Sequence, residues 1–98
     1  MKEYILCSSV WFDDGKKHNY QPKNINIGFV MCGYRHNSIF AQFGMTVKER
    51  KDIGIYTREQ GFLTNLNRFV NRMEAAKISY LSGQVDKPLK ELYSEDLY

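Results

Sequence analysis

Residues 3–12 read EYILCSSVWF, an almost unbroken run of apolar and small residues that includes β-branched and aromatic side chains. A run of this kind predicts a β-strand that is covered on both faces. The sequence Asp13-Asp14-Gly15 ends the strand and opens a polar loop that continues to Lys23. We therefore expect a buried strand close to the N-terminus.

The segment after this loop predicts a second strand and a short helix. Residues 25–32 alternate, and the large side chains of Ile25, Ile27, Phe29 and Met31 fall on the face expected to meet the core. After Gly33, residues 34–43 favour a short helix, which Gly44 is expected to end.

The middle of the chain is more polar. Residues 48–52, KERKD, are expected to form a charged, solvated turn. Two extended segments follow, at residues 53–57 and 61–64, and we expect them to pair as a hairpin across residues 58–60.

The strongest local signal marks a C-terminal helix. Asn71 is followed three residues later by Glu74, which is typical of a helix N-cap, and Gly83 supplies the stop. Its apolar residues form two stripes: Met73, Ala76 and Tyr80 on one side, Ile78 and Leu81 on another. Because two apolar sides need two partners, we expect the sheet to cover one and a second copy of the chain the other.

These segments predict a single α+β domain over residues 1–98. A small antiparallel sheet from the N-terminal half packs with the C-terminal helix, and the domain is expected to be homo-oligomeric. The body, residues 1–85, has 12 basic and 7 acidic residues, hence +5; the acidic C-terminal arm, residues 86–98, has two Lys and four acids, hence −2. This division suits an anionic small ligand, or an arm that docks on a neighbour.

Composition narrows the functional classes. The net charge of +3 is too mild to indicate a DNA-binding protein. No apolar stretch approaches the ~20 residues of a membrane span, and the N-terminal run does not resemble a signal peptide, so we expect a cytoplasmic protein. Cys7 and Cys32 are accordingly expected to be reduced and buried in strands. Aromatic residues make up 14% of the chain, which suggests a subunit interface or a pocket for a flat ligand.

Motifs for metal binding and catalysis are weak. The four possible metal ligands Cys7, His18, Cys32 and His36 lack the tight spacing of structural zinc sites. The chain has neither a P-loop nor a dinucleotide-binding glycine fingerprint. We therefore expect no metal, no cofactor and no enzymatic activity, and keep a nucleotide-processing enzyme with His18 or His36 as base as an alternative.

Residues 60–72, QGFLTNLNRFVNR, predict an anion site. Arg68 and Arg72 flank the expected helix N-terminus, whose free N–H groups favour an anion, and Asn67 adds an amide. Phe62 is a candidate ring for stacking on a base. The alternative is structural: Arg72 pairs with Glu74 or with the acidic arm, and the phenylalanines are core.

Four motifs carry a family resemblance. The segments ILCSSVWFDDGKKHNYQP (5–22), IGFVMCGYRHNSIF (27–40), QGFLTNLNRFVNRMEAAKI (60–78) and LYSEDLY (92–98) occur in this order. Together they resemble a family of small bacteriophage proteins that includes the Thoeris anti-defence sponges. The resemblance covers most of the chain apart from about residues 44–55.

The resemblance implies a role without catalysis. Such sponges bind the cyclic ADP-ribose isomers made by bacterial TIR-domain enzymes and hold them intact in the host cytoplasm. Members are homo-oligomers with ligand pockets between subunits, and some also hold cyclic oligonucleotides.

The resemblance also suggests site residues. It implies phosphate contacts from Arg68 and Arg72, which match the RFVxR motif, and adenine stacking by Phe40. It further implies pocket-lining roles for Arg35, His36 and Asn67. Relatives often carry a Cys shortly before the stacking Phe, where this chain has Ser38-Ile39, so the loop before Phe40 departs from the family pattern.

Sequestration of a cyclic nucleotide signal is therefore the leading hypothesis. A protein–protein inhibitor of a host defence enzyme is the second, and a nucleotide-processing phage enzyme is the third.

Overall fold

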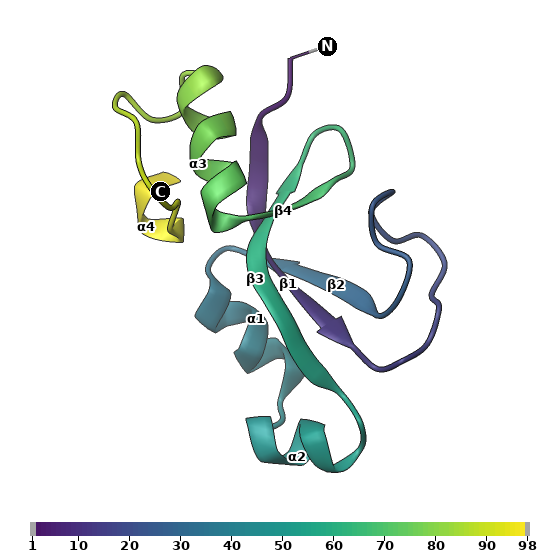
Figure 1. Ribbon diagram of the computed structural model, residues 1–98. Helices are drawn as coiled ribbons and strands as arrows, with labels where there is room; N and C mark the ends of the chain where they lie inside the picture. Colours follow the sequence, from purple (N-terminus) through teal and green to yellow (C-terminus); the bar gives the residue numbers. More distant parts are fainter. Residues whose placement is uncertain (1, 98) are drawn as a thin grey trace.

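Four antiparallel strands form one sheet in the order β2-β1-β3-β4, in a computed structural model that describes residues 2–97 (Figure 1). In chain order the elements are β1 (Ile5–Asp13), β2 (Phe29–Gly33), α1 (His36–Phe43), α2 (Val47–Asp52), β3 (Tyr56–Thr64), β4 (Phe69–Asn71), α3 (Arg72–Leu81) and α4 (Ser94–Leu97). The α+β class and the antiparallel sheet expected from the sequence are confirmed.

The N-terminal strand β1 lies inside the sheet, between β2 and β3. From Ser8 to Phe12 every residue is buried or half-buried, as predicted for a strand covered on both faces. Val10 and Phe12 are fully buried on the face that the helices cover. The apolar composition of the first motif thus reflects a central strand.

The helices pack on one face of the sheet as two groups. Ile39 of α1 joins Val10 and Phe12 in one core cluster, at the lower end in Figure 1. At the other end, the alanines of α3 join Ile5, Phe62, Val70 and Leu92 in a second cluster. Between the two helical groups, the middle of β3 is left partly uncovered, and this region holds the candidate site.

Several local predictions are confirmed. Helix α1 ends at Gly44, which adopts the left-handed conformation with φ 75°. Helix α3 begins after Asn71, whose side chain accepts a hydrogen bond from the N–H of Glu74 at 2.8 Å. Gly83 follows its end with φ 83°.

Five expectations are wrong. The second strand is shorter than expected, because residues 25–28 form a loop and β2 begins only at Phe29. The buried side of α3 is formed by Ala75, Ala76 and Ser79 rather than by one of the two expected stripes, because only small side chains fit against the sheet there.

Residues 53–64 do not form a hairpin: β3 is one continuous strand that pairs with β1, and a bulge leaves Arg58 without a partner in the register. Residues 48–52 belong to helix α2, because Thr46 and Glu49 form a reciprocal capping box that starts a helix. Cys32 is exposed rather than buried, because β2 lies at the edge of the sheet.

The C-terminal arm packs on the body of its own chain. Leu92 is fully buried in the second core cluster, and its N–H donates to the carbonyl of Arg72 at 2.9 Å. Ser94, the first residue of α4, is also buried. The arm therefore contributes to the fold of the monomer. No helix within residues 2–97 is long and apolar enough to cross a membrane.

Truncation of Leu92 tests this docking. We expect Leu92→Ala to lower the free energy of unfolding by about 2–5 kcal/mol, the usual cost of emptying a buried leucine site. The matched control Leu81→Ala removes a leucine that is 76% exposed and should change stability by less than about 0.5 kcal/mol. Urea unfolding followed by circular dichroism measures both. Equal effects of the two substitutions would contradict the docking.

Candidate functional site

Three of the predicted site residues meet in one hollow between the two helical groups. Arg35 precedes α1, His36 begins α1 and Arg72 begins α3. The hollow has a volume of about 130 Å³, and its other lining residues are Asn37, Gln60, Tyr93, Ser94 and Glu95. Arg35 and Arg72 are 37 positions apart in the sequence. The family resemblance assigns both to the ligand site, and the fold places them together.

His36 is held in a buried hydrogen-bond network. Its Nε2 lies 2.8 Å from the carbonyl oxygen of Gly61, which can only accept, so this nitrogen carries the proton. The other nitrogen, Nδ1, lies 3.1 Å from the Ser94 hydroxyl, which donates to it. Ser94 is in turn 2.6 Å from the hydroxyl of Ser8 on β1. The network therefore fixes one neutral tautomer of the imidazole.

The electrostatics agree with this assignment. Burial lowers the pKa of His36 below its ordinary value, and the nearby charge of Arg72 lowers it further. The hydrogen bond to Gly61 and the charge of Glu95 oppose this shift. His36 is thus uncharged at neutral pH, and the positive charge of the hollow resides on arginine.

Arg72 supplies this charge at the first turn of α3. One terminal nitrogen, Nη2, donates to the Gln60 side-chain oxygen at 3.0 Å and lies 3.5 Å from Nδ1 of His36. The guanidinium lies 5.1 Å from the centre of the Tyr93 ring. Its Nε is buried and has no hydrogen-bond partner among residues 2–97. Arg72 also takes no part in any of the ion pairs found among residues 2–97.

Two further hollows adjoin the first. One, of about 350 Å³, is bordered by Arg72 and Gln60 together with the β3 residues Thr57, Arg58 and Glu59. The other, of about 320 Å³, is also bordered by Gln60 and Thr57, and it contains the predicted stacking residue Phe40. The middle of β3 therefore connects Arg72 with Phe40 through neighbouring hollows.

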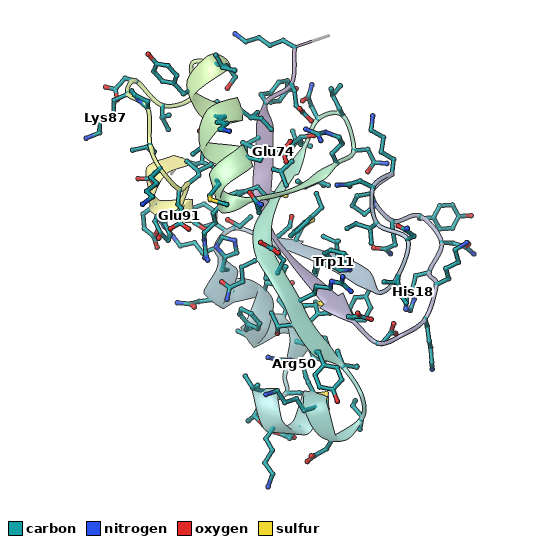
Figure 2. All side chains as sticks on the ribbon, in the orientation of Figure 1. Trp11, His18, Arg50, Glu74, Lys87 and Glu91 are labelled. Carbon is teal, nitrogen blue, oxygen red and sulfur yellow. The ribbon has the colours of Figure 1, made fainter. Side chains whose placement is uncertain are left out.

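The hollow that contains Phe40 also holds a buried cation. Arg50 of α2 lies between α2 and β3 in Figure 2 and is only 2% exposed. Its guanidinium lies 5.1 Å from the ring centre of Phe40, and Nη1 donates to the Met45 carbonyl at 2.7 Å. Phe40 is itself half-buried and packs edge-on against Phe12.

The remaining predicted residues lie outside these hollows. Arg68 is bound to Glu3 through two hydrogen bonds of 2.9 and 2.8 Å and to Glu74 through one of 2.9 Å. The hydrogen bonds from Arg68 to Glu3 lower the pKa of the Glu3 carboxyl group. Asn67 occupies the turn between β3 and β4, in the left-handed conformation with φ 59°. Phe62 is fully buried in the core, where its ring meets His36 edge-on at 5.2 Å.

Four site residues were missed in the sequence. Gln60 is the polar residue that borders all three hollows, and Tyr93 covers Arg72. Ser8 and Ser94 orient His36. Tyr93 and Ser94 belong to the LYSEDLY motif at residues 92–98, and membership of this motif is the sequence feature that could have indicated them as site residues.

Residues 2–97 contain no group of three or more His, Cys, Asp or Glu side chains that could hold a metal ion. His18, one of the four ligands considered, instead meets Asp14 at 2.8 Å in the exposed loop after β1.

Comparison with known proteins identifies the family. A family model described as the phage T4 y16D protein matches residues 4–98. The chain belongs to this family. The match covers nearly the whole chain, so the sheet, the C-terminal arm and the hollows between them all lie within the family region. No curated protein and no solved structure was found to match it.

The neutral imidazole of this phage protein predicts acid sensitivity. Because folding lowers the pKa of His36, the unfolded chain binds the proton more readily, and stability is lost as the pH falls below about 6.5. We expect the free energy of unfolding to decrease between pH 7 and pH 5, and His36→Gln to reduce this dependence. Urea unfolding at a series of pH values measures it. A full wild-type slope in His36→Gln would contradict the assignment.

Proposed function

We propose that this phage protein binds a cyclic ADP-ribose-type immune signal and holds it without cleavage, thereby blocking Thoeris immunity. The observation that carries the proposal is the buried Nε of Arg72, an N–H donor that has no partner among residues 2–97 and borders two hollows. A buried donor without an acceptor is costly, and a bound anion would supply the acceptor. The family resemblance in the sequence supplies the class of ligand.

Arg72 suits a phosphate or pyrophosphate group. Its guanidinium stays positive at all physiological pH values and offers parallel N–H groups that match two phosphate oxygens. Tyr93 and Gln60 fix its orientation before a ligand arrives, which lowers the entropic cost of binding. Neutral His36, whose Nδ1 lies 3.5 Å from Nη2 of Arg72, adds no second positive charge at this contact.

Phe40 is the better of the two candidate rings for the base. It borders a hollow that adjoins the Arg72 region, whereas Phe62 has no exposed surface to offer. Tyr56, which borders the same hollow and is 52% exposed, offers a second ring. We propose that the base lies in this hollow while the phosphates reach Arg72. Arg68 is then a structural residue, which binds Glu3 before β1 and Glu74 in α3 and takes no part in ligand binding.

The state of His36 favours binding over turnover. Its Nε2–H is directed at a backbone carbonyl, and Nδ1 already accepts a hydrogen bond from Ser94. A general base needs a free nitrogen within reach of the proton that it removes. This arrangement supports sequestration over the alternative of a nucleotide-processing enzyme with His36 as base.

We further propose that the functional form is a homo-oligomer. The outward surface of α3 exposes Met73 (55%), Tyr80 (44%) and Leu81 (76%). An adjoining hollow of about 220 Å³ is lined by Lys77 and by the apolar residues Ala76, Tyr80, Leu81, Pro88 and Leu89. Apolar side chains gathered on one helix are typical of protein contacts. The same surface supports the second candidate function, inhibition of a host defence enzyme by direct contact.

Substitution of Arg72 tests the ligand site. We expect Arg72→Gln to weaken binding of the cyclic ADP-ribose isomer roughly 10- to 100-fold, because a charged hydrogen bond contributes about 1.5–3 kcal/mol. Calorimetry with a panel of isomers and cyclic oligonucleotides measures the affinities. The control Arg68→Gln removes an arginine four positions away and should keep ligand affinity. Wild-type protein that binds none of these nucleotides would refute sequestration.

The fate of the ligand separates sequestration from catalysis. After incubation with the bound isomer, heat denaturation should release nucleotide with its original mass and retention time. Recovery of a cleaved nucleotide would instead establish an enzyme. If Arg72→Gln still blocks the defence system in infected cells, direct inhibition of a host protein is the better explanation.

Light scattering of the purified protein tests the oligomer. We expect a mass that is a multiple of 11.5 kDa. Leu81→Glu should lower this mass, because it places a charge in the apolar contact. The exposed substitution Lys87→Gln, in the loop after α3, changes the net charge by the same single unit and should not lower the mass. A wild-type monomer would contradict this part of the proposal.

A further inference from the structure

The two cysteines lie together on adjacent strands, away from the ligand site. Cys32 on the edge strand β2 is directly opposite Ser9 of β1 in the sheet register. Cys7 is two residues from Ser9, so its side chain emerges on the same face of the sheet. This face is opposite to the one on which Val10 and Phe12 meet the helices. Cys32 is exposed and Cys7 is half-buried.

The groups around Cys32 stabilise its thiolate. The Ser9 hydroxyl lies 3.2 Å from the Cys32 sulfur, and the Cys7 thiol also donates toward it. These two donors lower the pKa of Cys32 to about 6, although burial opposes the shift. The same interaction raises the pKa of Cys7, which keeps its proton. At neutral pH the pair therefore consists of one exposed thiolate and one neighbouring thiol.

We propose that Cys7 and Cys32 form a peroxide-reactive dithiol, in which Cys32 attacks and Cys7 resolves. The Cys32 thiolate attacks one oxygen of a hydroperoxide, the O–O bond breaks, and the leaving oxygen departs as water or an alcohol after protonation. Cys32 becomes a sulfenic acid. Because Cys32 is then uncharged, the interaction that held the proton on Cys7 is lost; Cys7 gives up its proton and attacks the Cys32 sulfur. The S–O bond of the sulfenic acid breaks, a disulfide forms, and the hydroxyl leaves with that proton as water. Two thiols are oxidised and one peroxide is reduced.

The edge position of β2 allows the second step. Diagonal residues of neighbouring strands lie about 7–8 Å apart between Cα atoms, slightly more than a disulfide spans. Strand β2 has only five residues and is paired on one side, by β1. A slide of β2 along β1, which brings the diagonal pair closer, therefore disturbs this one ladder only. The resulting bond would close next to Ser8, whose side chain belongs to the His36 network.

Mass spectrometry of the intact protein tests the proposal. After treatment with hydrogen peroxide at pH 7, we expect the wild-type monomer to lose two hydrogen atoms and both free thiols, and a reductant should restore them. Cys7→Ser should stop at the sulfenic acid, which a cyclic dione traps as a stable adduct on Cys32. Cys32→Ser should form neither the adduct nor the disulfide at the same peroxide concentration.

Three outcomes would overturn the proposal: wild-type protein that gains oxygen atoms without losing the two hydrogens, a disulfide that joins two chains, or dione trapping on Cys7 in Cys32→Ser. The far-ultraviolet circular dichroism of each variant shows whether it is folded. Serine has nearly the volume of cysteine, so we expect both variants to fold.

Discussion

The buried imidazole of His36 is the interaction on which the arrangement of the site depends. Through Gly61, Ser94 and Ser8 it connects α1 with β3, α4 and β1. A buried polar group without a partner costs about 1–3 kcal/mol, so each of these elements must stay in place to satisfy the others. The short C-terminal helix is held to the sheet by this network together with the burial of Leu92.

The neutral state of this imidazole determines where the charge of the site lies. Protonated His36 would place a cation 3.5 Å from a terminal nitrogen of Arg72 and would lose the hydrogen bond that Nδ1 accepts from Ser94. Burial prevents this at neutral pH. The charge of Arg35 faces Glu95, so Arg72 is the arginine of the hollow without an ion pair among residues 2–97, and its Nε–H has no partner there. A fixed cation between polar side chains suits recognition of an anion by position and charge.

The sequence predicted those parts of the fold that depend on local chemistry. The apolar run of β1, the Asn71 cap and the Gly44 stop each act within a few residues. The polar sequence Arg58-Glu59-Gln60 resembles a turn, which is why it predicts a hairpin in place of the single strand β3. In the structure these residues extend along β1, and a bulge accommodates Arg58. The contact between Ser8 and Ser94 spans 86 positions, and no periodicity or spacing signals it.

The two arginines of the RFVxR motif illustrate the same limit. By sequence both are equally suited to a phosphate, but among residues 2–97 Arg68 forms ion pairs with two carboxylates whereas Arg72 forms none. Residues 86–97 of the acidic arm likewise form no ion pair with Arg72. Glu91 instead accepts a hydrogen bond from the Tyr93 hydroxyl at 2.8 Å, and Glu95 faces Arg35 at 3.6 Å. The arm thus brings a ring to the Arg72 guanidinium. Its carboxylates Glu91 and Glu95 line the hollows that Arg72 borders, but they contact Tyr93 and Arg35 there rather than Arg72.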